Sequence, residues 1–556
     1  MKIRKYRALR ALRSAVFGLT LFSGLLVGGT GTAFSFETAV LSPVDSGTVS
    51  RLKLHMTQDY DLAIAGAAAN PDLHQKRLQD LAGTGSAAQT GLCNPTPFNP
   101  GVDADGYCWG NAADDSGSND WYPQGFSVPH TVSGDGTWNS RRWEVTSWHY
   151  RNDNVLSKLR FIDRGSSTPR YIDVLLVTAQ SDGSVAPVTG NHVDGVVWYE
   201  NHLLIANGSQ LVAVSLENLM APTSELDGFS YVLPIEYTYS TGGCNDLKGS
   251  AGYTPYQPCL NGISFDRSNG ALTTSEYRST DNEESQRTGA IDGPPTRIIR
   301  WPFAANTGLP KADDGTTHGD STAAAAWYSP VWSMQGVVYA QGSFFISGAC
   351  PSSFDNSYRE PACIHKGAPG GGTSVLTQAP DMTQNLDWDA STGRIRGVNE
   401  VGQSSQPYPQ RVVFDISGTS RSLSVVRFKN VNSGKCLTPY GASLNNGADI
   451  VQWDCNGHSG ENWYWNGSEI RSFLSNRCLT IYGGSTSNGA LAVQWDCNGS
   501  PSQQWTRVAG NGGSMLRNGN TLCLTVYGGS TDNGADANQW SCDSKNLAHA
   551  WVGYTP

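Results

Sequence analysis

The sequence has few charged residues and no long apolar run beyond its first 33 residues. Only 15% of its 556 residues are charged, and no later run approaches the ~20 apolar residues that a membrane-spanning helix needs. The formal charge is −10, and an acidic chain is a poor candidate for binding nucleic acid. We therefore expect neither a membrane span nor a nucleic-acid partner.

Several catalytic and metal-binding signatures are also absent. The chain has no Gly-x-Ser-x-Gly elbow, no His-Glu-x-x-His and no phosphate-binding glycine loop. None of its 12 cysteines has Cys-x-x-Cys spacing, so we favour disulfides over zinc. No cofactor and no resident metal ion are expected.

Six of the cysteines fall in three close pairs, 13 or 15 residues apart. Each pair would close a short loop, which stabilises a fold by roughly 3 kcal/mol in the chain-entropy model. An even number of cysteines is typical of exported chains. The pairs are Cys93 with Cys108, Cys244 with Cys259, and Cys350 with Cys363.

The first 33 residues have the composition of a secretory signal peptide. Cationic residues between Lys2 and Arg13 precede an apolar run from Ala15 to Val27, and small residues follow as far as Ala33. The run is too short for a spanning helix, and an uncleaved anchor is the alternative. Cleavage near Ala33 would take the formal charge from −10 to −16 and release a secreted, extracellular protein.

The rest of the composition favours strands over helices. The chain has 63 Gly, 17 Trp and 22 Tyr, a mixture typical of turns and aromatic strands. Residues 34–120 are expected to form a short helix and a disulfide-closed loop that pack on the main domain or dock a partner. Asn70-Pro71 is typical of a helix start. The residues that would bury one side of this helix and end it are Leu73, Leu78, Leu81 and Gly83.

Residues 121–418 repeat a polar residue, often followed by glycine, and then a short apolar strand. Five places match, with starts 70, 67, 74 and about 50 residues apart. Strand units at such spacing are typical of a β-propeller of about five blades, where glycines let the innermost backbones approach closely. Six blades or an irregular β-sandwich are the alternatives. The starts are Gln124-Gly125, Asp194-Gly195, Asn261-Gly262, Gln335-Gly336 and Gln384-Asn385.

Beyond a short polar break at Ser417–Ser420, residues 423–556 hold one pattern written three times. The copies begin 42 and 45 residues apart, and the two cysteines within each copy are always 19 apart. Each copy reads Cys-Leu-Thr, Asn-Gly, Gln-Trp-x-Cys and a closing tryptophan. The cysteines are Cys436 with Cys455, Cys478 with Cys497, and Cys523 with Cys542. Three copies with fixed internal spacing indicate a repeat fold.

This pattern resembles the ricin-type lectin family, whose members fold as a β-trefoil and often bind carbohydrate. The resemblance implies one lobe per repeat and a disulfide within each. It also implies that Trp463, Trp505 and Trp551 are core residues. The overall expectation is an all-β chain, an N-terminal β-propeller followed by a C-terminal β-trefoil that binds glycan or polysaccharide.

The tryptophan before each second cysteine matches the family's sugar-stacking position, although filling of the lobe by a half-buried indole is the alternative. The aspartate usual after Cys-Leu in galactose-binding members is threonine in all three copies, so galactose specificity does not carry over. Glu461 and His549 replace the glutamine that Gln503 retains. The tyrosines Tyr440, Tyr482 and Tyr527 add aromatic surface. The expected carbohydrate-binding residues are Thr438, Trp453, Glu461, Thr480, Trp495, Gln503, Thr525, Asn538 and Trp540.

Catalysis by the propeller would need two or three carboxylates converging in its channel. If the chain is a glycoside hydrolase, the candidates are Asp194, Asp387 and Glu276, with Asp266 and Asp389 nearby. The channel positions are mostly amides, so we lean against an enzyme. Acidic residues of a Gly/Thr-rich loop, with His318 among them, could bind a cation but are more typical of a solvated turn. They are Asp313, Asp314 and Asp320.

A secreted propeller joined to a divergent lectin is also similar in architecture to the lectin subunits of actinobacterial umbrella-shaped toxin particles. That resemblance implies other secreted protein subunits as partners. It would account for a channel without obvious acid–base residues and for the replaced galactose ligands. The sequence therefore leaves three hypotheses: a lectin on a propeller scaffold, a glycoside hydrolase with an appended lectin module, and a targeting subunit of an assembly.

Overall fold

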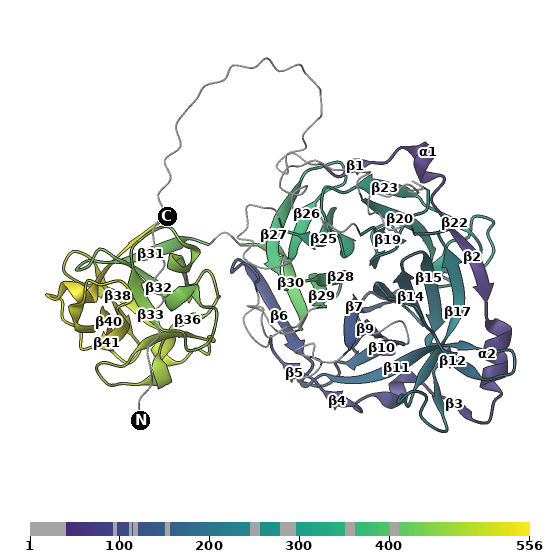
Figure 1. The fold of residues 1–556 in the computed structure, drawn as a ribbon, viewed down its shortest axis with the longest axis horizontal. Helices are drawn as coiled ribbons and strands as arrows, with labels where there is room; N and C mark the ends of the chain where they lie inside the picture. The colour runs from purple at the N-terminus through teal and green to yellow at the C-terminus, as the bar shows by residue number, and fades with distance from the viewer. Residues whose placement is uncertain are drawn as a thin grey trace, which may run out of the picture.

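The computed structural model describes residues 40–92, 97–110, 114, 120–150, 156–244, 256–277, 296–350, 362–400, 411–421 and 423–555. The expected signal peptide, residues 1–33, lies outside these residues. Within them, no helix is long and apolar enough to cross a membrane. The strands gather in two groups, a ring of sheets from β1 to β30 and a smaller group from β31 to β42 (Figure 1).

Five antiparallel ladders of four strands form the ring. The first has β7 (Trp121–Ser127), β9 (Trp143–Tyr150), β10 (Ser157–Asp163) and β11 (Arg170–Ala179). The second has β13 (Gly195–Tyr199), β14 (His202–Asn207), β15 (Gln210–Ser215) and β17 (Val232–Ser240). The third has β18 (Ile263–Asp266), β19 (Ala271–Ser275), β20 (Arg297–Ala304) and β23 (Ala325–Tyr328). The fourth has β24 (Gly336–Ala340), β25 (Ser343–Ala349), β26 (Ala362–Gly367) and β27 (Thr373–Ala379).

The fifth ladder joins both ends of the domain. It has β28 (Thr383–Asp389), β29 (Arg394–Asn399), β30 (Val413–Ser420) and, as its fourth strand, β6 (Val102–Cys108) from the N-terminal segment. The first strands of the five ladders contact one another in a closed circle, β7 to β13, β18, β24, β28 and back to β7. This arrangement is a β-propeller, and the pairing of β6 with β30 closes it.

The N-terminal segment differs from its expected form. The helix predicted over residues 70–83 is confirmed only in part. Leu78–Leu81 form a short 3-10 helix with both leucines buried, but Leu73 begins β3 (Leu73–Gln75), which pairs with β16 (Met220–Pro222). A longer helix, α2 (Asp61–Ala68), lies before the predicted start. The Asn70 side chain accepts a hydrogen bond from the Asp72 backbone N–H at 2.9 Å, which turns the chain instead of starting a helix. β2 (Lys53–Asp59) pairs with β17, so this segment supplies edge strands to the propeller.

The predicted role of the inner glycines is confirmed. A Cβ on Gly125 would lie 2.7 Å from the Val196 nitrogen, and one on Gly336 would lie 2.6 Å from the Asn385 Cα. These distances are too short for any side chain, so neighbouring inner strands meet backbone to backbone. Asn385 stands where the other four ladders have the glycine itself. Its amide accepts from the Ile263 N–H (3.0 Å) and donates to the oxygens of Ile263 (2.8 Å) and Phe126 (3.3 Å). Asn385 therefore bridges separate ladders at the centre.

The second group of strands is the β-trefoil. Each repeat contributes four strands. The first repeat has β31 (Val425–Asn430), β32 (Cys436–Pro439), β33 (Ile450–Trp453) and β34 (Trp463–Asn466), and the second has β35 (Glu469–Ser472), β36 (Cys478–Ile481), β37 (Ala492–Trp495) and β38 (Trp505–Ala509). The third has β39 (Ser514–Asn518), β40 (Cys523–Val526), β41 (Ala537–Trp540) and β42 (Ala550–Tyr554). The closing tryptophans are fully buried, as expected. Each indole donates to the carbonyl oxygen of a Cys-Leu leucine, at 2.9, 2.8 and 3.1 Å for Trp463, Trp505 and Trp551.

Five of the six expected disulfides are present: Cys244–Cys259, Cys350–Cys363 and the three within the trefoil repeats. Their Cα atoms lie 4.8 to 5.2 Å apart, within the usual range. Cys108 is also disulfide-bonded, and its expected partner Cys93 lies outside the described residues. In each trefoil repeat the disulfide joins the start of the second strand to the loop after the third.

Candidate functional site

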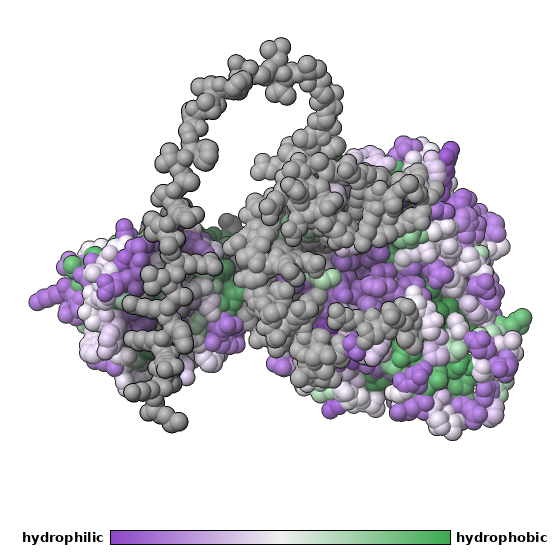
Figure 2. All heavy atoms as spheres, viewed as in Figure 1, coloured by the Kyte–Doolittle hydropathy of each residue, from purple (hydrophilic) through white to green (hydrophobic). Residues whose placement is uncertain are grey.

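Three tryptophans stand at the same place on the three trefoil repeats, each at the end of a third strand. Trp453, Trp495 and Trp540 are 39%, 39% and 46% exposed, whereas nearly all other apolar side chains on these strands are buried. A tyrosine of the same repeat lies beside two of them, with ring centroids 6.5 Å apart for Tyr440 and Trp453 and 6.4 Å for Tyr482 and Trp495. Each lobe thus exposes an aromatic side chain to solvent. Figure 2 shows the described surface of this smaller domain as mostly hydrophilic, with some hydrophobic patches.

Each of these tryptophans rests against the Asn-Gly turn of a neighbouring repeat. A Cβ on Gly447 would lie 3.3 Å from Cζ3 of Trp495, one on Gly489 would lie 3.5 Å from Trp540, and one on Gly534 would lie 3.4 Å from Trp453. All three glycines have positive φ, which favours glycine. The edge of each ring is therefore supported by backbone from the next lobe, and the ring position depends on assembly of the whole trefoil.

The asparagine of each turn fixes the residue after the tryptophan. Asn446 accepts from the Asp496 N–H at 2.8 Å and donates to its carboxylate at 2.6 Å. Asn533 forms the same two bonds with Asp454, at 2.9 and 2.7 Å. Asn488 forms them with Ser541, at 2.8 and 3.1 Å. The three sites therefore share one geometry.

Sequence analysis missed the charged residues beside the tryptophans. Asp454 accepts from Lys435 Nζ at 2.6 Å, and Asp496 pairs with Arg477. Both carboxylates are two-thirds exposed, and each follows a tryptophan by one residue. The third lobe has Ser541 in this place and Leu522 in place of the cation. The signal that would have revealed them is the repeated Asp after two of the three tryptophans.

The three threonines are turned inward. Thr480 and Thr525 are buried, and their hydroxyls donate to the carbonyl oxygens of Cys478 (2.8 Å) and Ala548 (3.2 Å). Thr438 is half-buried and donates to the Pro439 oxygen at 3.3 Å. These hydroxyls bond the protein's own backbone, so the structure does not present them to a ligand as it does the tryptophans.

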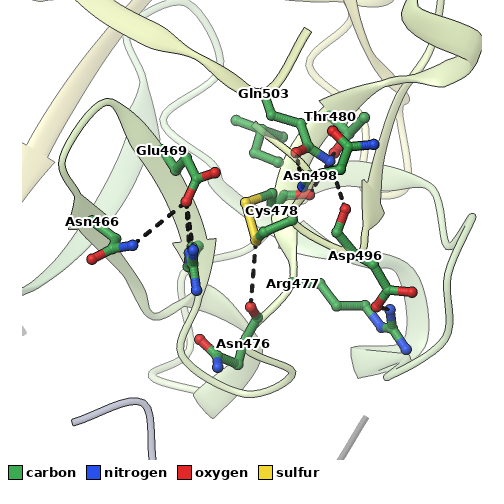
Figure 3. Close-up of a disulfide and its surroundings, with 12 residues drawn as sticks. Asn466, Glu469, Asn476, Arg477, Cys478, Thr480, Asp496, Asn498 and Gln503 are labelled. Carbon is green, nitrogen blue, oxygen red and sulfur yellow. Dashed lines mark hydrogen bonds and ion pairs between the residues drawn. A yellow bond between two sulfur atoms is a disulfide. The ribbon is translucent and has the colours of Figure 1, made fainter. Parts of the chain in front are cut away.

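Glu461, Gln503 and His549 share one role at the base of the lobes. Glu461 accepts from the Asn456 N–H at 2.8 Å, and Gln503 accepts from the Asn498 N–H at 2.7 Å. Figure 3 shows Gln503 between Thr480 and Asn498 beside the second-repeat disulfide. In the third repeat His549 Nδ1 accepts from the Asp543 N–H at 3.4 Å, and burial lowers the pKa of His549, which favours this neutral acceptor form. All three are buried, so the motif keeps its acceptor while the residue type changes.

Asn538 is also buried, on β41 beside Thr525. Its side-chain oxygen has no hydrogen-bond partner within the described part of the chain. The binding residues predicted from sequence therefore divide into three exposed rings and six inward-facing polar residues.

Of the carboxylates proposed for catalysis, Asp194 and Asp387 lie on opposite sides of the level of the inner glycines. β7 and β13 run side by side in the same direction. Two contacts show this: Gly125 adjoins Val196, and two residues further along both strands the Ser127 hydroxyl accepts from the Trp198 N–H at 3.1 Å. Asp194 precedes Gly195, whereas Asp387 lies beyond the glycine level, bonded to the Val128 N–H at 2.9 Å. Asp194 and Asp387 are thus separated by the crowded centre of the ring.

Each of these carboxylates already has strong partners. Asp387 accepts from His130 at 3.0 Å and from the Ser127 hydroxyl at 2.9 Å. Glu276 forms a buried bidentate ion pair with Arg297, at 2.8 and 2.6 Å. Asp266 pairs with Arg300 at 2.8 Å, and Asp389 accepts from Ser391 and Thr392. These bonds tie the four carboxylates to neighbouring groups of the inner strands.

Asp194 has a different setting, at the starting ends of the inner strands. It bonds His192 Nδ1 at 2.8 Å, and the His192 ring stacks on His149 with centroids 4.1 Å apart. Desolvation opposes the charged form of His192, but the Asp194 carboxylate outweighs it and raises the pKa of His192 to about 8. Burial, together with the charge of His192, lowers the pKa of His149 to about 4. This end also holds Gln124 and Gln384, which are buried and each have one unpaired polar atom among the described residues.

The carboxylates of the acidic loop bond separate neighbours. A cavity of about 480 Å³ lies between Met56 and the loop residues 313 to 320. However, Asp313 accepts from Thr322 (2.6 Å), Asp314 from Thr316 (2.6 Å), and Asp320 from the Met56 N–H (2.9 Å) with His55 beside it. Each carboxylate bonds a different neighbour, and all three residues are exposed, which is typical of the solvated turn predicted from the sequence.

Comparison with known proteins supports the trefoil. The family model described as "Ricin-type beta-trefoil lectin domain" matches residues 424–551. No curated protein matches this chain in a sequence comparison. The chain is similar to a designed 3-fold symmetric protein, ThreeFoil, at 25% identity over 24% of this chain and 99% of that chain, with a TM-score of 0.23.

Two further solved structures are similar to parts of the chain. One is the C-half of an earthworm R-type lectin in complex with GalNAc, at 17% identity over 24% of this chain and 99% of that chain (TM-score 0.21). The other is an exo-beta-1,3-galactanase from Clostridium thermocellum, at 12% identity over 79% of this chain and 100% of that chain (TM-score 0.30). The matched repeats, their disulfides and their lobes agree: residues 424–551 are a ricin-type β-trefoil lectin domain.

Proposed function

We propose that this chain is a secreted glycan-binding protein whose trefoil holds sugars on Trp453, Trp495 and Trp540. The observation that carries the proposal is that three indoles are exposed at equivalent places and braced by neighbouring repeats. The C–H face of a pyranose ring is apolar and fits an aromatic surface, while its hydroxyls need directional partners. A rigid ring loses little entropy on binding.

The polar partners at these sites are exposed carboxylates and tyrosines, not the buried threonines. Asp454 follows Trp453 and Asp496 follows Trp495, and both offer charged acceptors to sugar hydroxyls. The third lobe offers the neutral Ser541 instead. The three lobes would therefore differ in preference, and binding to a polymer would rely on simultaneous occupation of several weak sites.

A glycan array with the full chain tests this proposal. Hits are expected that weaken in Trp453→Ala, Trp495→Ala and Trp540→Ala, each by about tenfold, in line with a lost stacking contact. Leu62→Ala is the control, because Leu62 is also an apolar side chain at the surface, 90% exposed, but lies on α2 of the propeller domain. An array without hits, or hits that all three variants retain, would contradict the proposal.

The hydrolase hypothesis has weaker geometric support. A glycosidase needs two carboxylates about 5 to 10 Å apart with the sugar between them. Glu276 is paired with Arg297, and Asp387 accepts from two backbone N–H groups, the Ser127 hydroxyl and His130. Asp194 has fewer printed contacts among the described residues, one with His192 and one with the Gly208 N–H. If the hypothesis holds, sugars are released from a polysaccharide and Asp194→Asn stops the release, while the tryptophan variants keep the activity on short substrates.

The role as a subunit of a secreted assembly stays a prediction, and it rests on architecture alone. It requires that the chain co-purify with other secreted chains from culture medium. Elution as a single ~60 kDa species would contradict it. The glycan-binding proposal does not depend on the result.

A further inference from the structure

The third strands of the three trefoil repeats meet around one axis. β33, β37 and β41 each contact the other two. Side chains two residues apart on a strand lie on one face, and so do those of directly paired residues. Six residues therefore share one face around the axis, which we call the axis face. Three isolated antiparallel bridges join them: Val451 to Asp536, Asp449 to Val493, and Leu491 to Asn538.

The bridged residues are close to one another. The Gln452 N–H, next to Val451, donates to the oxygen of Ala535, next to Asp536, at 3.0 Å. Bonds from these neighbouring positions place Val451 and Asp536 in a non-hydrogen-bonded pair, in which the Cα atoms are only about 4.5 Å apart. The other two repeats form the same bond, from Gln494 and from Gln539. The axis face is therefore compact.

The three repeats differ at one buried position of the axis face. Val451 and Val493 occupy it in the first two repeats, and each is 2% exposed. The third repeat has Asn538 there, at 1% exposed. Asn538 also lies on the same face as Asp536, two residues earlier in the chain. A buried amide thus replaces a buried valine beside a carboxylate.

The side-chain oxygen of Asn538 is left without a partner by this replacement. Its Oδ1 atom is buried and accepts no hydrogen bond from the part of the chain that the structure describes. A buried carbonyl oxygen without a partner is unfavourable, and valine fills the same place in the other repeats without that penalty. The amide therefore indicates a ligand that binds to an oxygen atom.

The carboxylates of Asp449 and Asp536 repel each other on the same face. Burial raises the pKa of Asp536, and the negative charge of Asp449 raises it further. Asp449 is exposed and Asp536 is half-buried. Among the described residues, neither side chain has a hydrogen bond or an ion pair. Two negative charges and an amide oxygen are thus gathered without a positive partner from these residues.

We propose that the axis face binds Ca²⁺, with Asp449, Asp536 and the side-chain oxygen of Asn538 as its protein ligands. Ca²⁺ prefers carboxylate and amide oxygens, and it takes roughly 6 to 8 ligands in flexible geometry with water among them. The ion would neutralise the two carboxylates and join the first repeat to the third. The proposal does not depend on glycan binding by the tryptophans.

Calorimetric titration and thermal unfolding of the full chain test the proposal. Ca²⁺ is expected to bind with a dissociation constant of about 1 mM, in the range of weak extracellular sites. About 10 mM CaCl₂ should then raise the melting temperature of the trefoil by about 3 to 6 °C over choline chloride of equal ionic strength. Choline screens the carboxylates but is not coordinated by them. No heat of binding, or equal melting temperatures in the two salts, would overturn the proposal.

Three variants locate the site. Asp536→Asn removes a charged ligand and should weaken Ca²⁺ binding at least tenfold. Asn538→Val inserts the residue that the other two repeats carry, so it should fold, and it should weaken binding several-fold. Asp532→Asn removes an exposed carboxylate of the same repeat and should leave the affinity unchanged. Undiminished Ca²⁺ binding by folded Asp536→Asn and Asn538→Val would refute this site.

The sign of the stability change distinguishes an ion site from a structural carboxylate. In EDTA, Asp536→Asn should be at least as stable as the unmodified chain, because it removes the repulsion from Asp449. In about 10 mM CaCl₂ the order should reverse, because only the unmodified chain gains from the ion. A variant that is less stable by the same amount in both conditions would show that Asp536 acts without Ca²⁺.

Discussion

Trp495 lies on Gly447, a glycine of the preceding repeat, with 3.3 Å between the ring and the place of a Cβ on that glycine. The contact joins a residue of β37 to a turn some 48 positions earlier. The same relationship recurs for Trp540 with Gly489 and for Trp453 with Gly534. A flat binding surface in one lobe is thus built by two lobes.

Gly447→Ala is expected to weaken glycan binding through Trp495 several-fold. The new methyl group would press on the ring edge, and the positive φ of Gly447 adds about 1 kcal/mol of backbone strain. Gly467→Ala is the matched control: Gly467 also has positive φ and lies in a trefoil turn, but nothing is within 4 Å of its added Cβ. Both variants should lose similar stability in thermal unfolding, and only Gly447→Ala should lose binding. Equal binding by both would show that the glycine does not position the ring.

Asn385→Ala is expected to destabilise the propeller by roughly 2 to 4 kcal/mol. The substitution leaves the buried Ile263 N–H and carbonyl groups without their amide partner at the centre of the ring. Asn306→Ala, at an exposed turn, is the control and should change stability by less than about 0.5 kcal/mol. Denaturant unfolding followed by circular dichroism measures both. A change for Asn385→Ala as small as for the control would show that the bridge is not needed.

The His192–Asp194 pair should make stability depend on pH in a defined direction. The folded-state pKa of His192 is raised to about 8, above its unfolded value of about 6.5. Its stabilising contribution is therefore complete below pH 6.5 and is lost as the pH rises through 8. In Asp194→Asn this loss should disappear, and NMR titration should place the pKa of His192 below 6.5. An unchanged His192 pKa in that variant would contradict the assignment.

Loss of the second-repeat disulfide, by Cys478→Ser with Cys497→Ser, should destabilise the trefoil by about 3 kcal/mol. The bond closes a loop of 19 residues, and opening it enlarges the unfolded ensemble. The Cys523–Cys542 disulfide closes a loop of the same length, so its removal should cost a similar amount. Thermal unfolding of the two double variants gives the comparison. Widely different losses would mean that native contacts, not loop closure, set the contribution.

The trefoil fold could be predicted from the sequence because the motif that specifies it is local and occurs three times. Each copy carries its own cysteine pair, turn and closing tryptophan at fixed spacing, so the pattern predicted the fold, the three disulfides and the buried Trp505 core position. The crowded glycines of the propeller were predicted for the same reason. Such features need no knowledge of distant partners.

The errors arose where distant segments meet. The pairing of β6 with β30 joins strands some 300 residues apart, and no local pattern encodes it. The carboxylate of Asp387 bonds His130, which lies 257 positions away, and the sequence does not predict this pair. The helix expected after Asn70 gives way to a strand because β16 offers an edge to pair with. The Trp495–Gly447 contact is likewise an outcome of lobe assembly.

The most direct test is a crystal structure of the full chain with the strongest glycan from the array. A sugar ring stacked on at least one of Trp453, Trp495 and Trp540, with a hydroxyl on Asp454 or Asp496 where those lobes are occupied, is the predicted result. Sugar density bound elsewhere, with all three tryptophan faces empty, would contradict the account.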